Sequence, residues 1–179
     1  MGNLEVTDGN GCKTSNKPLI AVSACLLGQS VRYDGKDKYS AVIAETLNEY
    51  CRLIPVCPEV EIGLGVPREK IQLTQVDGHI KVLKTDNLKI DVAQPLADFA
   101  VNFVKEHALS GLVLQDKSPS CGIENTVLFS LSGEQIGLGS GIFASTIMEL
   151  FPRLVVVRAS QLQNQKDIDS FINRLHHPR

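Results

Sequence analysis

The chain has 179 residues, 43% of them hydrophobic and 21% charged, and its formal net charge is −2. A chain of this length can bury a sizeable core within one domain, so it needs no disulfides for stability. No apolar run approaches the length of about 18 residues that a membrane span requires. A long nucleic acid needs clustered Lys and Arg, which the near-neutral charge argues against. These properties favour a small-molecule ligand.

The first 17 residues are polar and rich in Gly, Asn, Ser and Thr. They predict a flexible tail, residues 1–17, followed by a single domain over residues 18–179. The tail lacks the basic and apolar regions of a secretory signal, which indicates a cytoplasmic protein. In that reducing compartment, cysteines more often bind metals or catalyse than form disulfides. Cys12, within the tail, has no expected role.

Apolar patterns along the chain predict strands and helices in alternation. Taken in order, they indicate a strand at 19–23, a helix at 41–51, a strand at 53–56, a helix at 92–109, and strands at 111–114 and 127–130. A Gly-rich segment at 136–141 then leads into a helix through Met148 and Leu150, followed by a strand at 154–157 and a terminal helix at 167–176.

Residues 71–85 interrupt this alternation. Two short runs flank Asp77-Gly78, a preferred type I′ turn pair, so they predict a β-hairpin at the edge of the structure. The whole pattern predicts an α/β fold, with one mostly parallel sheet, helices on both of its faces, and the hairpin in addition.

Three of the predicted strands lead into a cysteine. Cys25 and Cys57 follow the first two strands, and Cys121 lies in the loop after the strand at 111–114. Because the ligand crevice of an open α/β sheet lies at the carboxyl ends of its strands, we expect these cysteine loops to meet there, although the three thiols are far apart in sequence. Cys51, at a predicted helix end with no motif around it, is expected to be structural.

Three converging thiols have more than one interpretation. Structural zinc prefers four ligands, usually in Cys-x-x-Cys pairs, which the sequence lacks. An iron-sulfur cubane held by three cysteines leaves one iron open to a substrate atom. Free cysteines are also often simply small buried residues. Composition and spacing leave these alternatives open.

Three motifs together carry a resemblance to a known family. They are Ser23-Ala24-Cys25-Leu26-Leu27-Gly28, Cys57-Pro58-Glu59-Val60 and Lys117-Ser118-Pro119-Ser120-Cys121-Gly122. In this order they resemble the thiouracil desulfidase family. The resemblance implies a 4Fe-4S cluster held by Cys25, Cys57 and Cys121. It also implies hydrolytic removal of sulfur from a thiolated uracil-type nucleobase, nucleoside or nucleotide. The alternative is a non-catalytic iron-sulfur or zinc module that senses redox state or serves a partner protein.

Such hydrolysis requires a general base and a hydrogen-bonding group. Glu59, two residues after Cys57, is the candidate base, although it could instead form an ion pair with Arg32 or Arg68. Ser118 is the candidate to bind the ring or the developing charge, and Ser before Pro is also ordinary turn chemistry. Lys117 is expected either to bind a substrate oxygen or to be solvated.

Further residues are candidates for substrate binding. The Gly-rich segment that contains Gly139 and Ser140 could cradle a phosphate on its backbone N–H groups, or it could allow close packing. The run from Arg32 to Asp34 could hold a base or ribose, or form a surface turn. The assigned substrate-binding residues are Arg32, Tyr33, Asp34, Ser120, Gly139 and Ser140.

Overall fold

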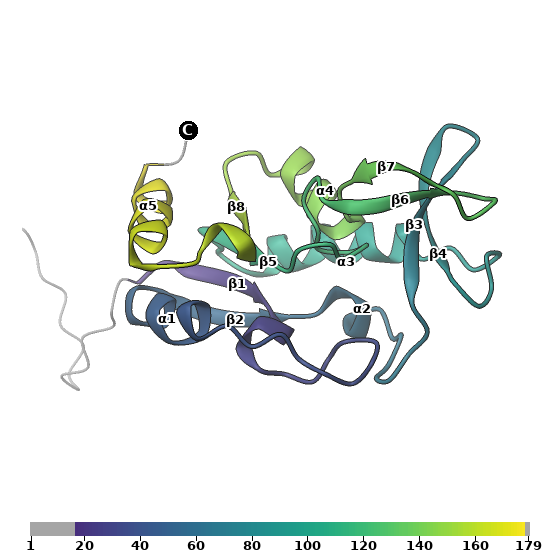
Figure 1. The fold of residues 1–179 in the computed structure, drawn as a ribbon. Coiled ribbons are helices and arrows are strands. Elements are labelled where there is room, and N and C mark those ends of the chain that lie inside the picture. Colours follow the sequence, from purple (N-terminus) through teal and green to yellow (C-terminus); the bar gives the residue numbers. More distant parts are fainter. Residues whose placement is uncertain (1–16, 178–179) are drawn as a thin grey trace, which may run out of the picture.

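The computed structural model describes residues 17–177, and Cys12 with nearly all of the predicted tail lies outside them. The described residues form two four-stranded sheets with helices packed around them (Figure 1). We refer to these sheets as sheet A and sheet B.

Sheet A is the parallel sheet that the sequence predicts. All of its neighbouring strands pair in parallel, in the order β2-β1-β5-β8. Its members are β1 (Leu19–Ser23), β2 (Arg52–Val56), β5 (Gly111–Leu114) and β8 (Val155–Arg158). β2 contains Pro55, and it lies at the edge, where a residue without an N–H group is tolerated.

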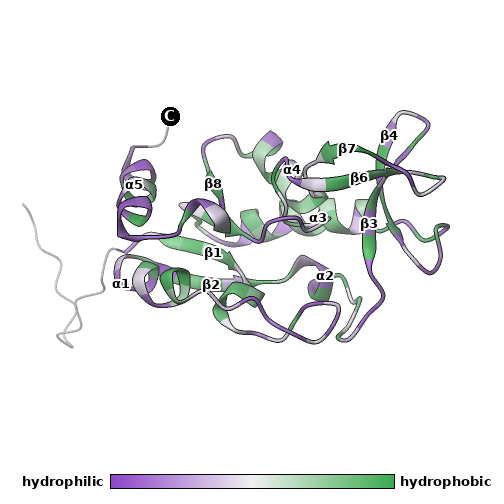
Figure 2. Cartoon of the chain, viewed as in Figure 1, coloured by the Kyte–Doolittle hydropathy of each residue, from purple (hydrophilic) through white to green (hydrophobic). Residues whose placement is uncertain are grey.

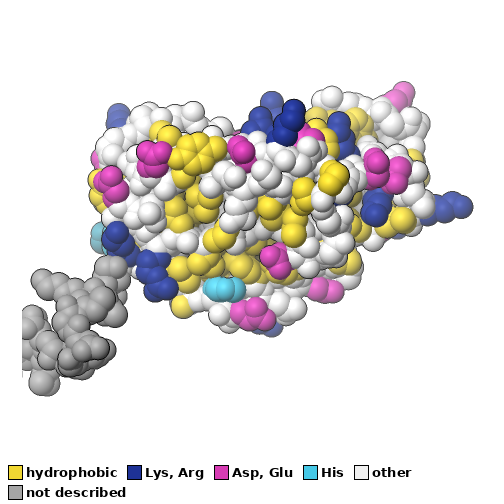
Figure 3. Space-filling model, turned by 90° about the horizontal axis from the view of Figure 1, so that it is seen from below, with side chains coloured by type: hydrophobic (Ala, Val, Ile, Leu, Met, Phe, Trp, Pro, Cys, Tyr) yellow, Lys and Arg dark blue, Asp and Glu magenta, His cyan; other side chains and the backbone are white. Residues whose placement is uncertain are grey.

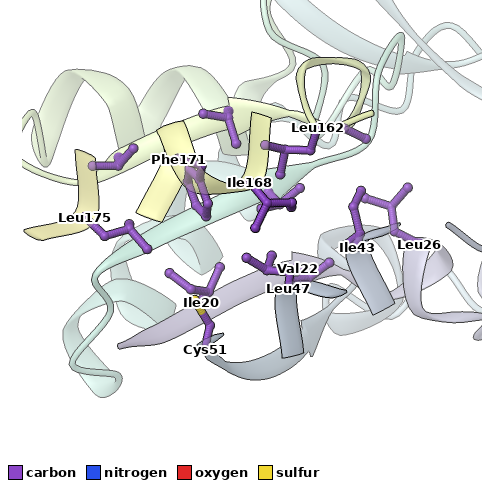
Figure 4. Packing of buried hydrophobic residues seen from close by; sticks show 14 of the residues in the cluster. Ile20, Val22, Leu26, Ile43, Leu47, Cys51, Leu162, Ile168, Phe171 and Leu175 are labelled. Atoms are coloured by element: carbon purple, nitrogen blue, oxygen red, sulfur yellow. The ribbon is translucent and has the colours of Figure 1, made fainter. Parts of the chain in front are cut away.

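One face of sheet A packs against the start and the end of the described chain. Ile20, Val22 and Val113 point to this face and join a buried cluster with Ile43 and Phe171. The helical partners are a π-helical turn (Val42–Thr46) with α1 (Leu47–Tyr50), and α5 (Gln165–His176). Figure 4 shows side chains of α5 pointing towards β1 across this cluster. β1 is hydrophobic along its length, whereas α5 alternates hydrophobic and hydrophilic residues (Figure 2).

The opposite face of sheet A packs against two further helices. Ala21, Leu112 and Leu114 form a second buried cluster with Phe103 and Phe143. These aromatic residues belong to α3 (Ala93–Glu106) and α4 (Ile142–Leu150), respectively. Since successive strand residues point to opposite faces, the alternation of Ile20, Ala21 and Val22 supplies both clusters. The prediction of helices on both faces of the sheet is confirmed.

Sheet B was not expected as a separate sheet. It contains β3 (Ile71–Val76), β4 (His79–Lys84), β6 (Thr126–Ser130) and β7 (Gln135–Gly139), in the order β4-β3-β6-β7. The predicted hairpin is confirmed, and Asp77 (φ 49°) and Gly78 (φ 79°) both adopt the left-handed conformation of a type I′ turn. Of the hairpin strands only β4 lies at the edge of the sheet, because β3 pairs in parallel with β6. The segment expected only as a lead-in to a helix supplies β7.

Hydrophobic and charged side chains mix on the surface drawn in Figure 3. Among the described residues on this face, Lys and Arg are interspersed with Asp and Glu, which is unlike the continuous basic area used to bind a phosphate backbone. Within residues 17–177, no helix combines the length and apolar character needed to cross a bilayer.

Candidate active site

A cavity of about 440 Å³ opens at the carboxyl ends of β1, β2 and β5. Cys25 lies in the 3-10 turn after β1 (Ala24–Leu27), and Cys57 directly follows β2. Cys121 comes from the loop after β5, and all three cysteines are free and line the cavity. Cys51 is also free but does not line the cavity; it is 1% exposed and packs in the core beside Ile20 (Figure 4).

Burial and mutual repulsion affect the three thiols. Burial, and then the nearby Cys57, raise the pKa of the Cys25 thiol to about 11, while Arg32 opposes this shift. Burial also raises the pKa of Cys57. For Cys121 burial again raises the pKa most, a hydrogen bond with Ser23 opposes it, and Glu59 and then the other two cysteines raise it further. The metal-free thiols therefore hold their protons at neutral pH, and binding a metal would release them.

The described residues include no group of three or more His, Cys, Asp or Glu arranged to hold a single metal ion. The ligands of a cubane bind different irons, so they do not need to converge on one point.

The Cys121 loop is built around Ser118. Its Oγ atom accepts hydrogen bonds from the backbone N–H groups of Ser120 (3.2 Å) and Cys121 (3.1 Å). Its carbonyl oxygen accepts from Gly122 N–H (2.8 Å) and from Thr126 Oγ1 (2.9 Å). Ser118 thus performs the turn chemistry expected of Ser before Pro. It also lines the cavity, and its own hydroxyl hydrogen remains free to donate.

The loop is then fixed to the start of α4. Ile142 N–H donates to the carbonyl of Pro119, and Ala144 N–H to that of Ser120, each at 3.1 Å. Gly141 passes so close to the loop that an added Cβ would overlap the Ser120 carbonyl group and come within 2.8 Å of Cys121 N. A side chain at position 141 would therefore displace the backbone that carries Cys121.

Glu59, in the short helix α2 (Pro58–Glu61), links two of the cysteine loops. Its Oε2 accepts from Nε and Nη2 of Arg68, both at 2.9 Å, and its Oε1 accepts from Ser120 Oγ at 2.9 Å. The side chains of Arg68 and Glu59 are only 6% and 13% exposed. Of the two ion-pair partners considered for Glu59, the structure selects Arg68. The carboxylate nevertheless lines the cavity.

Comparison with known proteins places this site in a family. The family model described as 2-thiouracil desulfurase matches residues 20–159, which include all three cysteine motifs. The chain belongs to the 2-thiouracil desulfurase family. This confirms the resemblance found in the sequence.

Two relatives of this 2-thiouracil desulfurase family member are informative. The chain is 27% identical over 144 residues to the uncharacterized protein YbbK of Bacillus subtilis (strain 168), covering 76% of this chain and 94% of the relative. It also resembles the solved structure of a 4Fe-4S-dependent thiouracil desulfidase, TudS. That match has 29% identity and a TM-score of 0.64, and it covers 82% of this chain and 93% of the other.

In this desulfurase family member, some predicted substrate-binding residues line the cavity and others do not. Arg32 and Tyr33 line it, and the guanidinium carbon of Arg32 lies 5.7 Å from the centre of the Tyr33 ring. Asp34 does not line it, and pairs with Arg32 at 3.9 Å. Ser120 is fully buried and acts on the cavity only through its bond to Glu59.

The predicted phosphate cradle finds no support in the geometry. Gly139 lies within β7, Ser140 Oγ accepts from Glu124 N–H at 2.9 Å, and neither residue lines the cavity. The N–H groups at the start of α4 are bonded to the Cys121 loop. Close packing, the other interpretation of this Gly-rich segment, describes Gly141 well.

Several residues of the cavity were missed by the sequence analysis. Lys70 lines it with its ammonium 4.9 Å from the centre of the Tyr33 ring, and Lys38, Ser23 and Asp116 line it as well. Ser23 and Asp116 stand at the carboxyl ends of β1 and β5, and this position alone could have identified them. Lys38 and Lys70 lie in irregular segments, where the sequence contains no comparable signal.

Proposed function

We propose that this protein is a 4Fe-4S-dependent desulfidase that hydrolyses the carbon–sulfur bond of a thiolated uracil compound. Water would convert the thiocarbonyl to a carbonyl, and the sulfur would leave as hydrogen sulfide. The observation that carries the proposal is the meeting of Cys25, Cys57 and Cys121 in one cavity of a 2-thiouracil desulfurase family member. Free thiols at this site fit a reducing, cytoplasmic location.

The donor set fits the cluster. Cys25, Cys57 and Cys121 would each hold one iron, and the described residues that line the cavity include no His and no fourth Cys. When bound, the cluster would supply an iron with an open position, a soft Lewis acid suited to a thiocarbonyl sulfur. The relative TudS, described as 4Fe-4S-dependent, supports this assignment.

The protein side chains would position the water and the pyrimidine. Glu59 would take a proton from the attacking water, with Arg68 and Ser120 holding its carboxylate in place. Ser118 has a hydroxyl hydrogen to donate to a polar atom of the ring. Lys117, which is exposed and lines the cavity, would bind a substrate oxygen.

The charge of the cavity supports an anionic substrate. Glu59 is paired with Arg68, and the Asp116 carboxylate accepts hydrogen bonds from Asn125 and Ser160. These neutral donors do not cancel the Asp116 charge, but four further basic side chains of the cavity outnumber it: Arg32, Lys38, Lys70 and Lys117. Only Arg32 among them has an acidic partner within 4.0 Å in the described part of the chain. This positive charge, in a chain of net charge −2, would favour a phosphorylated thiolated nucleoside over the free base.

The test is anaerobic reconstitution followed by measurement of iron, acid-labile sulfide and hydrogen sulfide release. We expect turnover of 2-thiouracil, 4-thiouridine or 4-thiouridine monophosphate, with kcat/KM for the monophosphate about tenfold higher and falling with added salt. Iron-loaded protein that releases no sulfide from any of these three compounds would refute the proposed desulfidase activity. Zinc bound in place of iron would favour the non-catalytic module.

A further inference from the structure

Lys117 adopts a backbone conformation that its side chain does not favour. Its φ angle is 58°, in the left-handed region, where a residue with a Cβ atom is disfavoured. The sequence offers no glycine here, although Lys117 directly precedes the loop that carries Cys121. Since Lys117 lines the cavity, this turn decides where its ammonium lies. A disfavoured conformation persists only when its surroundings hold it.

The side chain of Asn125 holds the Lys117 turn. Its Oδ1 atom accepts the Lys117 N–H at 3.0 Å, and its Nδ2 donates to Asp116 Oδ1 at 2.7 Å. One end of the amide requires a donor and the other an acceptor, so both partners fix its orientation. Asn125 therefore connects the backbone of Lys117 to the carboxylate of the residue before it.

Asp116 is in turn anchored to the turn that follows β8, the neighbouring strand of sheet A. Besides Asn125, its Oδ1 accepts from Ser160 Oγ at 2.7 Å, and its Oδ2 accepts from Ser160 N–H at 2.9 Å. Ser160 lies in the 3-10 turn Ala159–Gln161, which follows β8. Asp116 thus lines the cavity with its two oxygens already bonded. We call Asp116, Asn125 and Ser160 the clamp.

We propose that Asn125 is a positioning residue, and that the clamp holds Lys117 in its left-handed turn so that its ammonium meets the polar end of the substrate. The substrate part rests on the function proposed above. Cys121 is held separately, because its N–H bonds to Ser118 Oγ. Loss of the clamp should therefore weaken substrate binding and leave cluster retention unchanged.

The first test is Asn125→Ala in iron-loaded protein. We expect KM for 4-thiouridine monophosphate to rise about tenfold, the effect of losing one good polar contact, with kcat within about threefold of wild type. Iron content should match wild type. The control is Asn87→Ala, because Asn87 Oδ1 also accepts a backbone N–H, from Lys89 at 3.1 Å, but Asn87 does not line the cavity. An unchanged KM in Asn125→Ala would overturn the proposal.

A double-mutant cycle separates positioning from general loosening. If Asn125 acts through Lys117, Asn125→Ala should add no further rise in KM to Lys117→Ala. Full additivity of the two effects would refute the coupling.

Exchanging the amide of Asn125 and the carboxylate of Asp116 keeps the proposal testable if Asn125→Ala fails to fold. Asn125→Asp keeps an acceptor for the Lys117 N–H but places a second carboxylate against Asp116. We expect KM to rise in this variant and to return towards wild type when Asp116→Asn is added, because the amide and the carboxylate have then changed places. Absence of rescue would contradict the clamp.

Proteolysis supplies a readout that does not depend on turnover. Trypsin cuts after Lys117 only if the turn can open, so cleavage between Lys117 and Ser118, followed by mass spectrometry, should be about tenfold faster in Asn125→Ala than in wild type. Equal cleavage rates would refute the clamp. If the wild-type protein releases no sulfide, the proposed function fails, and this measurement still decides whether Asn125 holds the turn.

Discussion

Individual cysteines in this protein have distinct chemical environments. Replacing Cys25, Cys57 or Cys121 by Ser should abolish iron retention, because a cubane with three protein ligands has none to spare. Cys51→Ala should retain iron and cost about 1 kcal/mol of stability, since it removes a small side chain from the core. Iron and acid-labile sulfide, measured on the four purified variants, check this. Equal iron content in all four variants would show that Cys25, Cys57 and Cys121 do not hold the cluster.

Glu59 is expected to combine a chemical and a structural role. Glu59→Gln should retain the cluster and slow sulfide release by roughly 10²- to 10⁴-fold, because the amide cannot accept the proton of water. Arg68 would lose its anionic partner, so the free energy of unfolding should fall by about 1 to 3 kcal/mol. Single-turnover sulfide release at matched iron content measures the first effect, and urea unfolding measures the second.

Glu61→Gln is the matched control, since Glu61 lies in the same short helix, is exposed and does not line the cavity. Turnover like that of wild type in Glu59→Gln, together with lower stability, would assign this carboxylate to structure alone.

Among individual residues, the sequence predicted the cysteines of the cavity better than the residues that hold the surrounding loops in place. Each cysteine follows an apolar run, and such runs form a parallel sheet whose strand ends meet. The partner of Glu59 was left open between Arg32 and Arg68, because the loop that carries Arg68 has no periodicity. The bond from Lys117 to Asn125 depends on a left-handed turn at a lysine, which no residue preference indicates.

Among the larger elements, the contact between the Cys121 loop and α4 can be tested with glycines. Gly141→Ala should lower the free energy of unfolding by about 1 to 3 kcal/mol, the usual cost of overpacking. It should also reduce iron content, because the added methyl would push on the Cys121 backbone. The conformation itself is not the obstacle, since Gly141 has φ −63°.

Gly137→Ala provides the control, because a Cβ at Gly137 would meet nothing within 4 Å. Urea midpoints and iron content measured on both variants decide the matter. Equal behaviour of the two would show that the loop does not depend on this contact.

Elements with a strong pattern were predicted close to their observed bounds. The assembly of the hairpin with β6 and β7 into sheet B was not predicted. The strands of sheet A are short apolar runs, and the hairpin has its turn pair, so local sequence is sufficient for them. β7 contains Gly137 and Gly139, and glycines at this density are typical of a loop, so the sequence did not indicate a strand. The parallel pairing of β3 with β6 joins segments far apart in the chain, and a local pattern contains no information about such partners.

For the molecule as a whole, the buried thiols make stability depend on pH. Burial raises the pKa of Cys25 from the ordinary 9.0 to about 11 and that of Cys121 as well, so between pH 9 and 11 the folded metal-free protein binds more protons than the unfolded chain. Its stability should therefore be complete below pH 9 and decrease as the pH rises towards 11. Thiolates bound to iron have no proton to lose, so the iron-loaded protein should lose less stability.

Urea midpoints at pH 8 and pH 10, with and without iron, test this expectation. Burial also raises the pKa of Cys51 to about 11, so this residue adds to the pH dependence of the metal-free and the iron-loaded protein alike. The comparison is therefore made in the Cys51→Ala variant. A metal-free protein as stable at pH 10 as at pH 8 would show that burial does not raise the pKa values of Cys25 and Cys121.

The attachment of the Cys121 loop to α4 has a consequence for how the protein is made in the cell. A ribosome releases Cys25 and Cys57 early, but the groups that fix Cys121, at Ile142 and Ala144, follow it in the chain. The nascent chain therefore cannot present all three thiols in place until α4 has been synthesised and has docked. On the proposed function, the cluster would then be inserted only after α4 has docked, through the mouth of a cavity that is already shaped.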